Sequence, residues 1–385
     1  MVRKVCIVVT ARPSYARIKT VIAAVKAHPD LELQLVVAAS ALLERYGGAI
    51  EVMRADGYEP DALVYMVLEG ENTVTMAKST GLGLVELATV FDNLQPDLVV
   101  TVADRYETLA TATAASYMNI PTVHVQGGEV TGSIDEKVRH AVTKLSDLHL
   151  VCTERAQEFV IRLGERPEAV HRTGCPSLDI AHEIARAPEL GMDPIERYGG
   201  TGPDVPLDRG FLVVLQHPVT TEEDEAFAQI SETLHAVREV GIPVLWFWPN
   251  VDAGSDGTSK GIRQFRELHR DAPMHFFRNM PPEEFLRLLI ASLAIVGNSS
   301  VAIRECSYLG VPAVNIGTRQ AGRERGHNVV DVDHDRDAIL AACRAQVEHG
   351  FYAPDETYGD GRSGQRIADL LSTVELTSSK RLAYV

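Results

Sequence analysis

The sequence predicts an α/β protein built from two doubly wound parallel sheets. Short apolar runs rich in β-branched residues alternate with longer amphipathic runs, which is the pattern of parallel strands connected by helices. The pattern fades over 188–208, where Gly, Pro and Asp are dense, and then restarts. A length of 385 residues also exceeds one ordinary core. We therefore expect a domain over 1–187, a linker over 188–208, a second domain over 209–361 and a tail over 362–385 that packs back on the first domain.

The expected strands of the first half are six apolar runs: 4–10, 31–39, 97–103, 122–127, 148–153 and 170–174. The clearest helices between them cover 14–28 and 107–119. In the second half the expected strands are 210–216, 243–249, 274–279, 293–298 and 312–317. Helices are expected near 222–240 and 282–291, and the tail from about 362 also has a helical pattern.

Composition excludes several classes of function. The formal net charge of −16 argues against nucleic acid or an anionic membrane surface as a partner, because binding either requires a basic face. The five cysteines form no CxxC pair, which favours a reducing, cytoplasmic setting over a disulfide framework. The apolar run near the N-terminus is too short for a signal peptide, and no stretch approaches the ~20 apolar residues of a membrane span.

Polar and charged residues follow most of the expected strands. Ligands of open parallel sheets bind beyond the carboxyl ends of the strands, so these positions are the candidate site. They are Arg12, Asp104, Arg105, Gly127, Gly128, Glu129, His217, Asn250, Asp252, Arg278, Asn298, Ser299 and Ser300.

The stretch "GNSSVAIREC" joins a strand to an expected helix. Gly297 allows close backbone approach, and Ser299 or Ser300 can cap the helix, whose free N–H groups attract phosphate. The alternative is a plain serine cap without a ligand. Glu305 lies within two turns and could accept from ribose hydroxyls, or it could pair with Arg304.

Three further stretches carry candidate binding groups. Arg319 and Arg323 follow the next strand, and the arginine fork suits phosphate oxygens, although a solvated basic loop is the alternative. His217 follows a strand and precedes a proline, where it could act as an acid, a phosphate donor or a structural histidine. In "WPNVDAGSDG", Asn250 and Ser255 are sensible sugar or phosphate partners.

The first half supplies carboxylates beside basic groups: Asp104, Arg105, Glu107, Glu129, Asp135, Glu136, Arg139 and His140. Such a cluster could move protons on and off a sugar carbon if burial raises some of the carboxyl pKa values. The alternative is helix pairing at a spacing of four, Asp135 with Arg139. Glu136 would pair with His140 in the same way. We expect no metal site, because no HxxxH or carboxylate–histidine cluster has ligand spacing.

Eight motifs occur in an order that resembles a known family: "TARPSYARIK", "ADRYETLA", "VQGGEVTGSIDEKVRHAVTKL", "GCPSLD", "LQHPVTT", "PNVDAGS", "GNSSVAIRE" and "GTRQAGRERGHNV". Over about Val5–Gln365 the chain is similar to the hydrolysing UDP-N-acetylglucosamine 2-epimerases, which make N-acetylmannosamine. The resemblance implies a GT-B fold, in which two Rossmann-like domains hold the nucleotide sugar in the cleft between them. It also implies a UDP-sugar as the small-molecule partner, no cofactor, and homodimers or homotetramers built on first-domain helices.

The resemblance also implies roles for residues. The expected catalytic set is Asp104, Glu129, Asp135 and His217. The expected substrate- and UDP-binding residues are Arg12, Arg105, Gln126, Arg139, Asn250, Ser255, Arg278, Ser299, Ser300, Glu305, Arg319 and Arg323. Within this set the serines lie at the diphosphate, Glu305 at the ribose, and His217, Arg12 and Arg323 at phosphate, while backbone near 278–280 holds the uracil. The implied reaction is loss of the C2 proton with departure of UDP, followed by addition of water and reprotonation from the other face.

Two departures from the family pattern leave the substrate and the base open. Ser14 occupies a position that is usually acidic, and Gln126 replaces a glutamate expected before the paired glycines. Because glutamine cannot act as a general base, either Glu129 or Asp104 takes that role or the sugar differs, a diacetylbacillosamine type being the main candidate. A non-hydrolysing epimerase, a GT-B glycosyltransferase and a non-catalytic nucleotide-sugar-binding protein are also compatible with these motifs.

Overall fold

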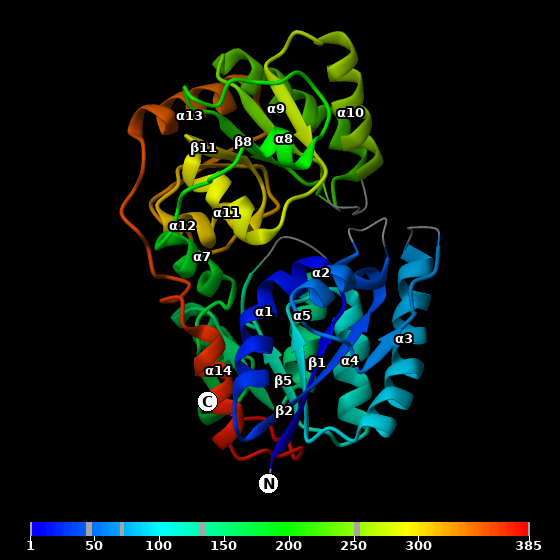
Figure 1. Ribbon diagram of the computed structural model, residues 1–385. Coiled ribbons are helices and arrows are strands. Elements are labelled where there is room, and N and C mark those ends of the chain that lie inside the picture. Colours follow the sequence, from blue (N-terminus) through cyan, green and yellow to red (C-terminus); the bar gives the residue numbers. More distant parts are fainter. Residues whose placement is uncertain are drawn as a thin grey trace. The chain divides into compact units, whose positions relative to one another are not determined.

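The computed structural model describes residues 2–43, 48–69, 73–130, 135–219, 221–249 and 255–383, without the side chains of Thr73, Asp135 and Ser255 (Figure 1). The chain forms two compact units. Unit 1 comprises Met1–Glu129, Ile134–Asp179 and Tyr358–Val385, and unit 2 comprises Val130–Ser133 and Ile180–Thr357.

Unit 1 contains, among the described residues, a seven-stranded parallel sheet in the order β3-β2-β1-β4-β5-β6-β7. Its strands are β1 (Arg3–Val9), β2 (Leu31–Ala38), β3 (Ala62–Val64), β4 (Leu98–Val102), β5 (Thr122–Val125), β6 (Leu148–Val151) and β7 (Val170–Arg172). Its helices are α1 (Arg12–Ala27), α2 (Ala49–Ala55), α3 (Thr73–Leu94), α4 (Tyr106–Tyr117), α5 (Asp135–Leu145), α6 (Glu154–Arg162), α7 (Ser177–Ala185, which continues into unit 2) and α14 (Ser363–Thr373). Short 3-10 turns are η1 (Ala39–Leu42) and η3 (Pro167–Ala169).

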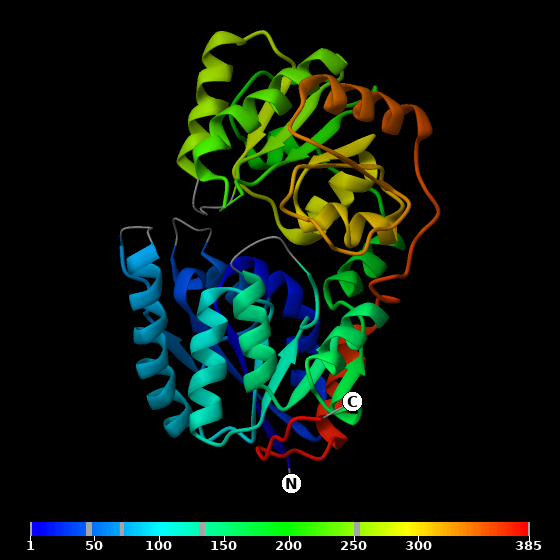
Figure 2. The same ribbon diagram turned by 180° about the vertical axis from the view of Figure 1, so that it is seen from behind.

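Helices cover both faces of this sheet, as its nearly continuous apolar strands require. On one face, α1 contributes Ile18, Ile22 and Val25, a 3.6-residue stripe that is fully buried together with Ile367 of α14 (Figure 1). On the other face, seen in Figure 2, α3 and α4 pack through residues such as Phe91 of α3. The predicted α/β class and all six predicted strands of the first half are confirmed.

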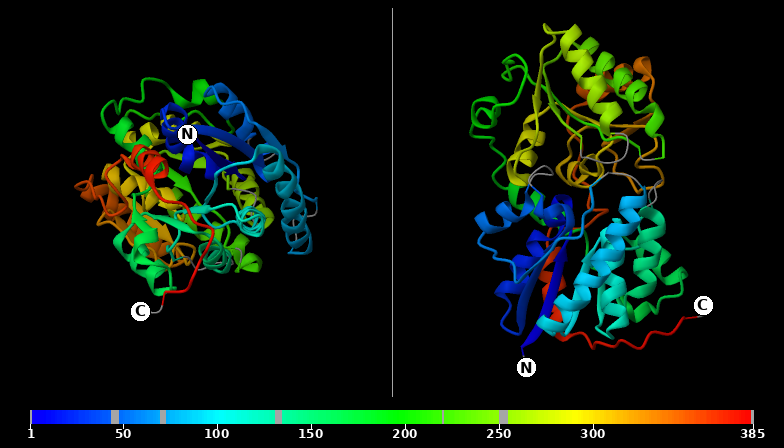
Figure 3. Two further views of the ribbon diagram at one scale, coloured as in Figure 1. Left: turned by 90° about the horizontal axis from the view of Figure 1, so that it is seen from below. Right: turned by 90° about the vertical axis from the view of Figure 1, so that its right-hand side faces the viewer.

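The C-terminal segment completes unit 1. The guanidinium of Arg3 in β1 donates to the carbonyls of Leu371 and Val374, the latter at 3.0 Å. The carboxylate of Asp179 accepts from the backbone N–H groups of Ser363 (2.8 Å) and Gly364 (2.6 Å), so it caps α14. After α14 the chain continues along the edge of unit 1 where its strands begin (Figure 3).

Unit 2 contains a six-stranded parallel sheet within the described residues, in the order β10-β9-β8-β11-β12-β13. Its strands are β8 (Leu212–Leu215), β9 (Val244–Phe247), β10 (Met274–Phe277), β11 (Ala294–Gly297), β12 (Ala313–Ile316) and β13 (Val329–Val332). Its helices and 3-10 turns are α8 (Pro194–Tyr198), η4 (Glu223–Glu225), α9 (Ala226–Val240), α10 (Ser255–Leu268), α11 (Pro282–Ala291), η5 (Ser300–Ala302), α12 (Glu305–Leu309) and α13 (Arg336–His349). The five predicted strands of the second half are confirmed.

Two expectations differ from the structure. Residues 188–208 belong to unit 2 and are not a free linker: His275 of β10 bonds the carbonyls of Gly199 and Pro203, both at 3.0 Å, and Val205 enters the core. The continuous helix expected after Ser299 is divided into η5 and the five-residue α12, with a turn at Ile303 and Arg304 between them.

Candidate functional site

In each sheet the strand order reverses at one point. Arg12 and Asp104 follow the strands on either side of it in unit 1, and His217 and Asn298 do so in unit 2. The reversal lies between β1 and β4 in unit 1 and between β8 and β11 in unit 2. Loops diverge on either side of such a point and leave room for a ligand at the carboxyl ends of the strands. Each unit therefore contributes its own set of candidate residues.

The backbone of unit 1 turns left-handed directly after three of its strands: at Ala39 (φ +52°) after β2, and at two residues that precede predicted site positions. Ala103 follows β4 with φ +65°, and Gln126 follows β5 with φ +67°. For residues other than glycine this conformation costs about 1–2 kcal/mol, so it persists only where surrounding contacts fix it. Ala103 and Gln126 immediately precede Asp104 and the paired glycines, which are predicted site positions.

Arg139 connects the predicted carboxylates of unit 1. Its guanidinium is fully buried and donates to Asp104 through both Nε (3.1 Å to Oδ2) and Nη2. Its Nη1 donates to the backbone carbonyl of Glu129 at 2.6 Å and to Glu136 Oε2 at 2.5 Å. Burial opposes the charge, but the carboxylates outweigh it and raise the pKa of Arg139. Asp104 and the Glu129 loop are thus held together by a permanent cation.

Of the two helix pairs expected in α5, one is confirmed, and the other involves a side chain outside the described residues. Glu136 does pair with His140, at 3.2 Å between Oε1 and Nε2. Arg139, however, bonds Asp104 from a different strand end, 35 residues away along the chain. The side chain of Asp135 lies outside the described residues, so its predicted role remains a prediction.

Two arginines add positive charge to this edge of unit 1. Arg105 pairs with the fully buried Glu107 at 3.2 Å and keeps about a third of its side chain exposed, at 33%. Arg12 begins α1 directly after β1, and its burial lowers its pKa to about 10. A guanidinium that burial penalises in this way gains most from an anionic ligand.

Gln126, which follows β5, is anchored to the segment that follows β7, two strands away in the sheet. Its Nε2 donates to Cys175 Sγ at 3.1 Å, and Cys175 lies 3.0 Å from the hydroxyl of Ser177. Its Oε1 is buried and has no hydrogen-bond partner among the described residues. Gln126 therefore fixes the loop that carries Glu129, whose side chain is also buried.

In unit 2, Asn298 links the loops at the reversal point. Its Oδ1 accepts from the backbone N–H of His217 (2.7 Å), and its Nδ2 donates to the His217 carbonyl (2.8 Å). Its own carbonyl accepts from Arg319 (3.2 Å) and Gln320 (2.8 Å). Asn298 is fully buried, and its four polar contacts join the ends of β8, β11 and β12. Sequence reasoning did not give this residue a role.

The remaining predicted residues of unit 2 lie as follows. Ser299 caps η5 by accepting from Val301 N at 3.4 Å, which is the capping role expected for it, and Ser300 is the first residue of η5. Arg323 is buried, at 8% exposure, and Arg278 is exposed after β10. Glu305 is half-buried at the start of α12.

Three candidate residues of unit 2 cannot be placed in the site. Asn250, Asp252 and the side chain of Ser255 lie outside the described residues. Within the described part of the chain, no three His, Cys, Asp or Glu side chains are grouped as a metal site would require. No helix of that part is long and apolar enough to span a membrane.

The candidate residues of the two units differ in their chemistry. Unit 1 presents carboxylates oriented by a buried arginine, which suits proton transfer at carbon. Unit 2 presents arginines, a histidine and serine-capped backbone, which suits an anionic group such as a diphosphate.

Comparison with known proteins identifies the family of the chain. The family model described as UDP-N-acetylglucosamine 2-epimerase matches residues 23–372. The UDP-N,N'-diacetylbacillosamine 2-epimerase (hydrolyzing) of Legionella pneumophila is 32% identical over 378 residues, covering 98% of each chain. The UDP-N-acetylglucosamine 2-epimerase of Neisseria meningitidis is 29% identical, covering 97% of this chain and 96% of the relative.

Solved structures show the same fold. The crystal structure of UDP-GlcNAc 2-epimerase from Neisseria meningitidis bound to UDP-GlcNAc matches with a TM-score of 0.80 at 18% identity, covering 96% of this chain and 99% of that one. The Methanocaldococcus jannaschii enzyme in complex with UDP-GlcNAc and UDP matches with a TM-score of 0.75 at 18% identity, with coverage of 96% and 99%. The expected GT-B fold class, with two Rossmann-like units, is confirmed.

Proposed function

The chain belongs to the UDP-N-acetylglucosamine 2-epimerase family, and we propose that it is a hydrolysing member. The proposed reaction converts a UDP-2-acetamido sugar into UDP and the free sugar inverted at C2. The observation that carries the proposal is the cluster of acidic residues in unit 1, where the buried Arg139 binds both Asp104 and the loop of Glu129.

The first stage is an elimination. A carboxylate takes the C2 proton, the C2–H electron pair forms the C1=C2 double bond, and the C1–O bond breaks with its pair leaving on UDP. Asp104 and Glu129 are the candidates for this base, with Asp135 as the third acid of the set. Gln126 is excluded from proton transfer, because an amide does not act as a general base at neutral pH.

The second stage adds water. A water oxygen bonds to C1 and gives up one proton to a carboxylate, while the electron pair of the C1=C2 bond takes a proton from an acid group on the opposite face of C2, which inverts that centre. A second acid on the other face of the sugar suits this step, and the unit 1 cluster provides more than one candidate carboxyl. His217 is the proposed acid or hydrogen-bond donor at the departing diphosphate.

UDP binding is proposed for unit 2. Ser299 and Ser300 at η5, with Arg319 and Arg323 after β12, supply hydroxyl, backbone and guanidinium donors for the diphosphate. Glu305 is half-buried and suits the ribose hydroxyls. Arg12 and Arg105 of unit 1 are the proposed additional cations.

Two sugars are candidates. UDP-N-acetylglucosamine, which would give N-acetylmannosamine, is the substrate expected from the sequence motifs. UDP-N,N'-diacetylbacillosamine is the second candidate, because the Legionella pneumophila relative at 32% identity is named for that activity. Five buried, unbridged thiols in the described chain support a reducing, cytoplasmic setting.

The deciding experiment is proton NMR of the purified protein with each UDP-sugar in deuterated water, without an acceptor. Free C2-inverted sugar that carries deuterium at C2, together with UDP, supports the proposal and identifies the substrate. Interconversion of the two C2 epimers of a UDP-sugar without release of UDP would establish the non-hydrolysing alternative. Thermal stabilisation by both compounds without turnover would favour a binding protein.

We also propose that the protein is a homodimer or homotetramer formed through the outer face of α3. This helix is apolar on both sides: Phe91 is buried against unit 1, while Val74 and Val85 are 61% and 65% exposed. Tyr65, just after the edge strand β3, is 72% exposed nearby in sequence. Exposed apolar faces of this kind mark interfaces. Light scattering should show an oligomer that Val85→Lys converts to monomer, and a monomeric wild type would contradict the proposal.

A further inference from the structure

His124 is a polar residue inside an otherwise apolar strand. It lies in β5, is fully buried, and belongs to none of the predicted catalytic or binding groups. Its Nε2 lies 2.9 Å from the backbone oxygen of Ala103, and its Nδ1 lies 3.2 Å from the hydroxyl of Thr143. Both ring nitrogens therefore have a partner.

These contacts fix the protonation state of the ring. A carbonyl oxygen only accepts, so Nε2 must carry the hydrogen, and the hydroxyl of Thr143 then donates to the bare Nδ1. Burial lowers the pKa of His124 to about 4, so the ring is neutral at physiological pH. His124 is thus a permanent single donor aimed at one backbone oxygen.

The acceptor belongs to the peptide that precedes Asp104. The carbonyl of Ala103 is part of the Ala103–Asp104 peptide unit, and Ala103 is the left-handed residue with φ +65°. On its other side, Asp104 is held by Arg139. Arg139 and Thr143 both project from α5, one turn apart. The contacts therefore form a closed circuit: α5, His124, the strained peptide, the Asp104 carboxylate, and α5 again.

The neighbouring glycine is part of the same arrangement. A Cβ placed on Gly127 would lie 2.8 Å from His124 Nδ1 and 3.3 Å from Thr143 Oγ1. The first of the two glycines before Glu129 is thus required by the imidazole, while the left-handed conformation belongs to Gly128, whose φ is +75°. The contact between Gly127 and His124 therefore connects the circuit to the loop that carries Glu129.

We propose that His124 is a positioning residue, which holds the Ala103–Asp104 peptide in its left-handed turn and so directs the Asp104 carboxylate toward the reacting carbon. This inference rests on the proposed function of Asp104. It assigns His124 no contact with the substrate and no proton transfer. Without the ring, the strained turn relaxes toward ordinary geometry and Asp104 moves, although Arg139 still neutralises it.

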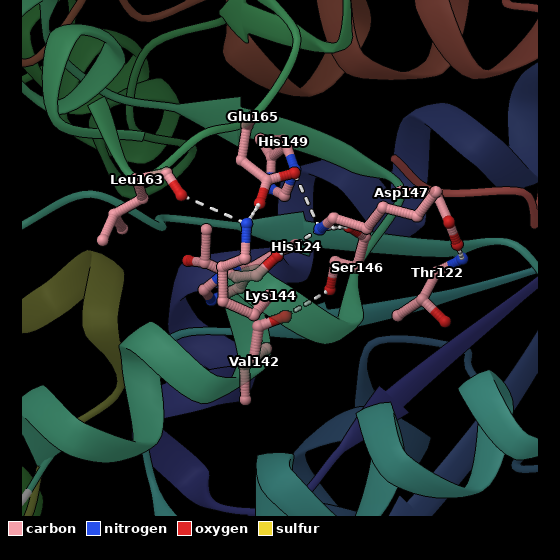
Figure 4. Close-up of polar contacts among 11 residues, drawn as sticks. Thr122, His124, Val142, Lys144, Ser146, Asp147, His149, Leu163 and Glu165 are labelled. Carbon is pink, nitrogen blue, oxygen red and sulfur yellow. Dashed lines mark hydrogen bonds and ion pairs between the residues drawn. The ribbon is translucent and has the colours of Figure 1, made fainter. Parts of the chain in front are cut away.

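The chain offers a matched control. His149 lies on β6 directly opposite His124 in the register, is also fully buried, and bonds Glu165 at 3.0 Å instead of a strand-end peptide (Figure 4). His124→Asn and His149→Asn each replace a buried imidazole ring with an amide and so remove the Nε2 donor. His124→Gln is the conservative variant, because its terminal amide nitrogen reaches about as far as Nε2 and can still donate.

The assay compares kcat, UDP affinity and urea stability for the three variants. We expect His124→Asn to lower kcat about 100-fold, the effect of a displacement near 1 Å, while UDP affinity stays within about threefold. His124→Gln should recover about tenfold of the loss, and His149→Asn should keep kcat within about threefold despite a similar loss of stability. Equal kcat values for His124→Asn and His149→Asn, or no recovery in His124→Gln, would overturn the proposal.

A measurement without turnover separates this inference from the proposed function. Histidine-selective nitrogen NMR, with the signal assigned by its loss in His124→Gln, reads the tautomer directly. The circuit requires a neutral Nε2–H ring with no titration between about pH 5 and 8. An Nδ1–H tautomer, or an ordinary titration near pH 6.5, would overturn the circuit even in an active enzyme. Absence of turnover in the wild type, with the required tautomer present, would reject only the proposed function.

Discussion

Glu165 lies at the centre of a buried ionic cluster at the edge of unit 1 where the strands begin. Its carboxylate accepts from Lys144 (2.5 Å), Lys380 (2.7 Å) and His149 (3.0 Å), as Figure 4 shows in part. Lys380 also donates to the carbonyls of Thr143 (2.9 Å) and Ser146, so it ties the C-terminal segment to α5. We predict that Glu165→Gln destabilises unit 1.

The magnitude follows from the pKa of Glu165. Burial raises it, but the hydrogen bonds from His149, Lys144 and Lys380 outweigh burial and lower it from 4.5 to about 2. At about 1.4 kcal/mol for each tenfold change in acidity, this fall corresponds to roughly 3 kcal/mol. That value is at the low end of the cost of breaking a buried ion pair, about 3–5 kcal/mol, which fits because Lys144 is 39% exposed and screened.

The pH dependence has a definite sign. Because the folded pKa of Glu165 lies below the unfolded value, its charge stabilises the protein above about pH 4.5, and the contribution is lost as the pH falls toward 2. Urea unfolding followed by far-UV circular dichroism should therefore show a gap of about 3 kcal/mol between wild type and Glu165→Gln at pH 7. The gap should narrow to roughly half by pH 3.

A matched control is Glu154→Gln. Glu154 pairs with Arg172 at 3.4 Å, but the two side chains are 88% and 55% exposed, so its loss should leave stability unchanged. The reasoning is refuted if Glu165→Gln costs less than about 1 kcal/mol, below any buried ion pair. A gap that is the same at pH 7 and pH 3 would refute it as well.

Three further changes have expected outcomes. Asn298→Ala removes both hydrogen bonds to the His217 backbone, so it should lower the free energy of unfolding in urea by about 2 kcal/mol and also lower kcat. An unchanged kcat would mean that the His217 loop keeps its conformation without Asn298. Gly297→Ala places a Cβ 2.2 Å from the Leu215 carbonyl at φ +137°, so the urea midpoint should fall by the equivalent of at least ~2 kcal/mol, and a wild-type midpoint would contradict this geometry. Gln126→Glu buries a carboxyl whose folded pKa is raised, so the melting temperature should be near wild type at pH 4 and drop as the pH rises to 8; a constant difference would contradict a buried site.

The strands could be predicted because each is a short apolar run whose pattern is local. β13 was not predicted because it is a largely exposed edge strand interrupted by Asp331. β3 was not predicted either, and only one of its three residues is buried. The break between η5 and α12 was missed for a different reason. Val301 and Ile303 are β-branched and only moderate helix formers, but no glycine or proline before Gly310 marks a break in the stretch from Ser299.

The positions of the candidate residues could be predicted, but their partners could not. Strand ends are identified by pattern, and a parallel sheet brings them to one edge. Which side chains then meet depends on strand order: Arg139 reaches Asp104, 35 residues away, and Gln126 reaches Cys175, 49 residues away. His124 had one usable signal, a polar residue in an apolar strand three positions before a glycine.

The course of the chain has a consequence for biosynthesis. Unit 1 is closed by α14, whose Ile367 fills the face covered by α1 and whose last turn bonds Arg3 of the first strand. Ribosomes deliver α14 only after all of Ile180–Thr357 has been made. During translation, therefore, one apolar face of the first sheet stays uncovered until α14 has been synthesised, while unit 2 can already fold. A stop codon just before Ser363 would leave that face permanently uncovered, and we expect such a product to depend on chaperones and to aggregate.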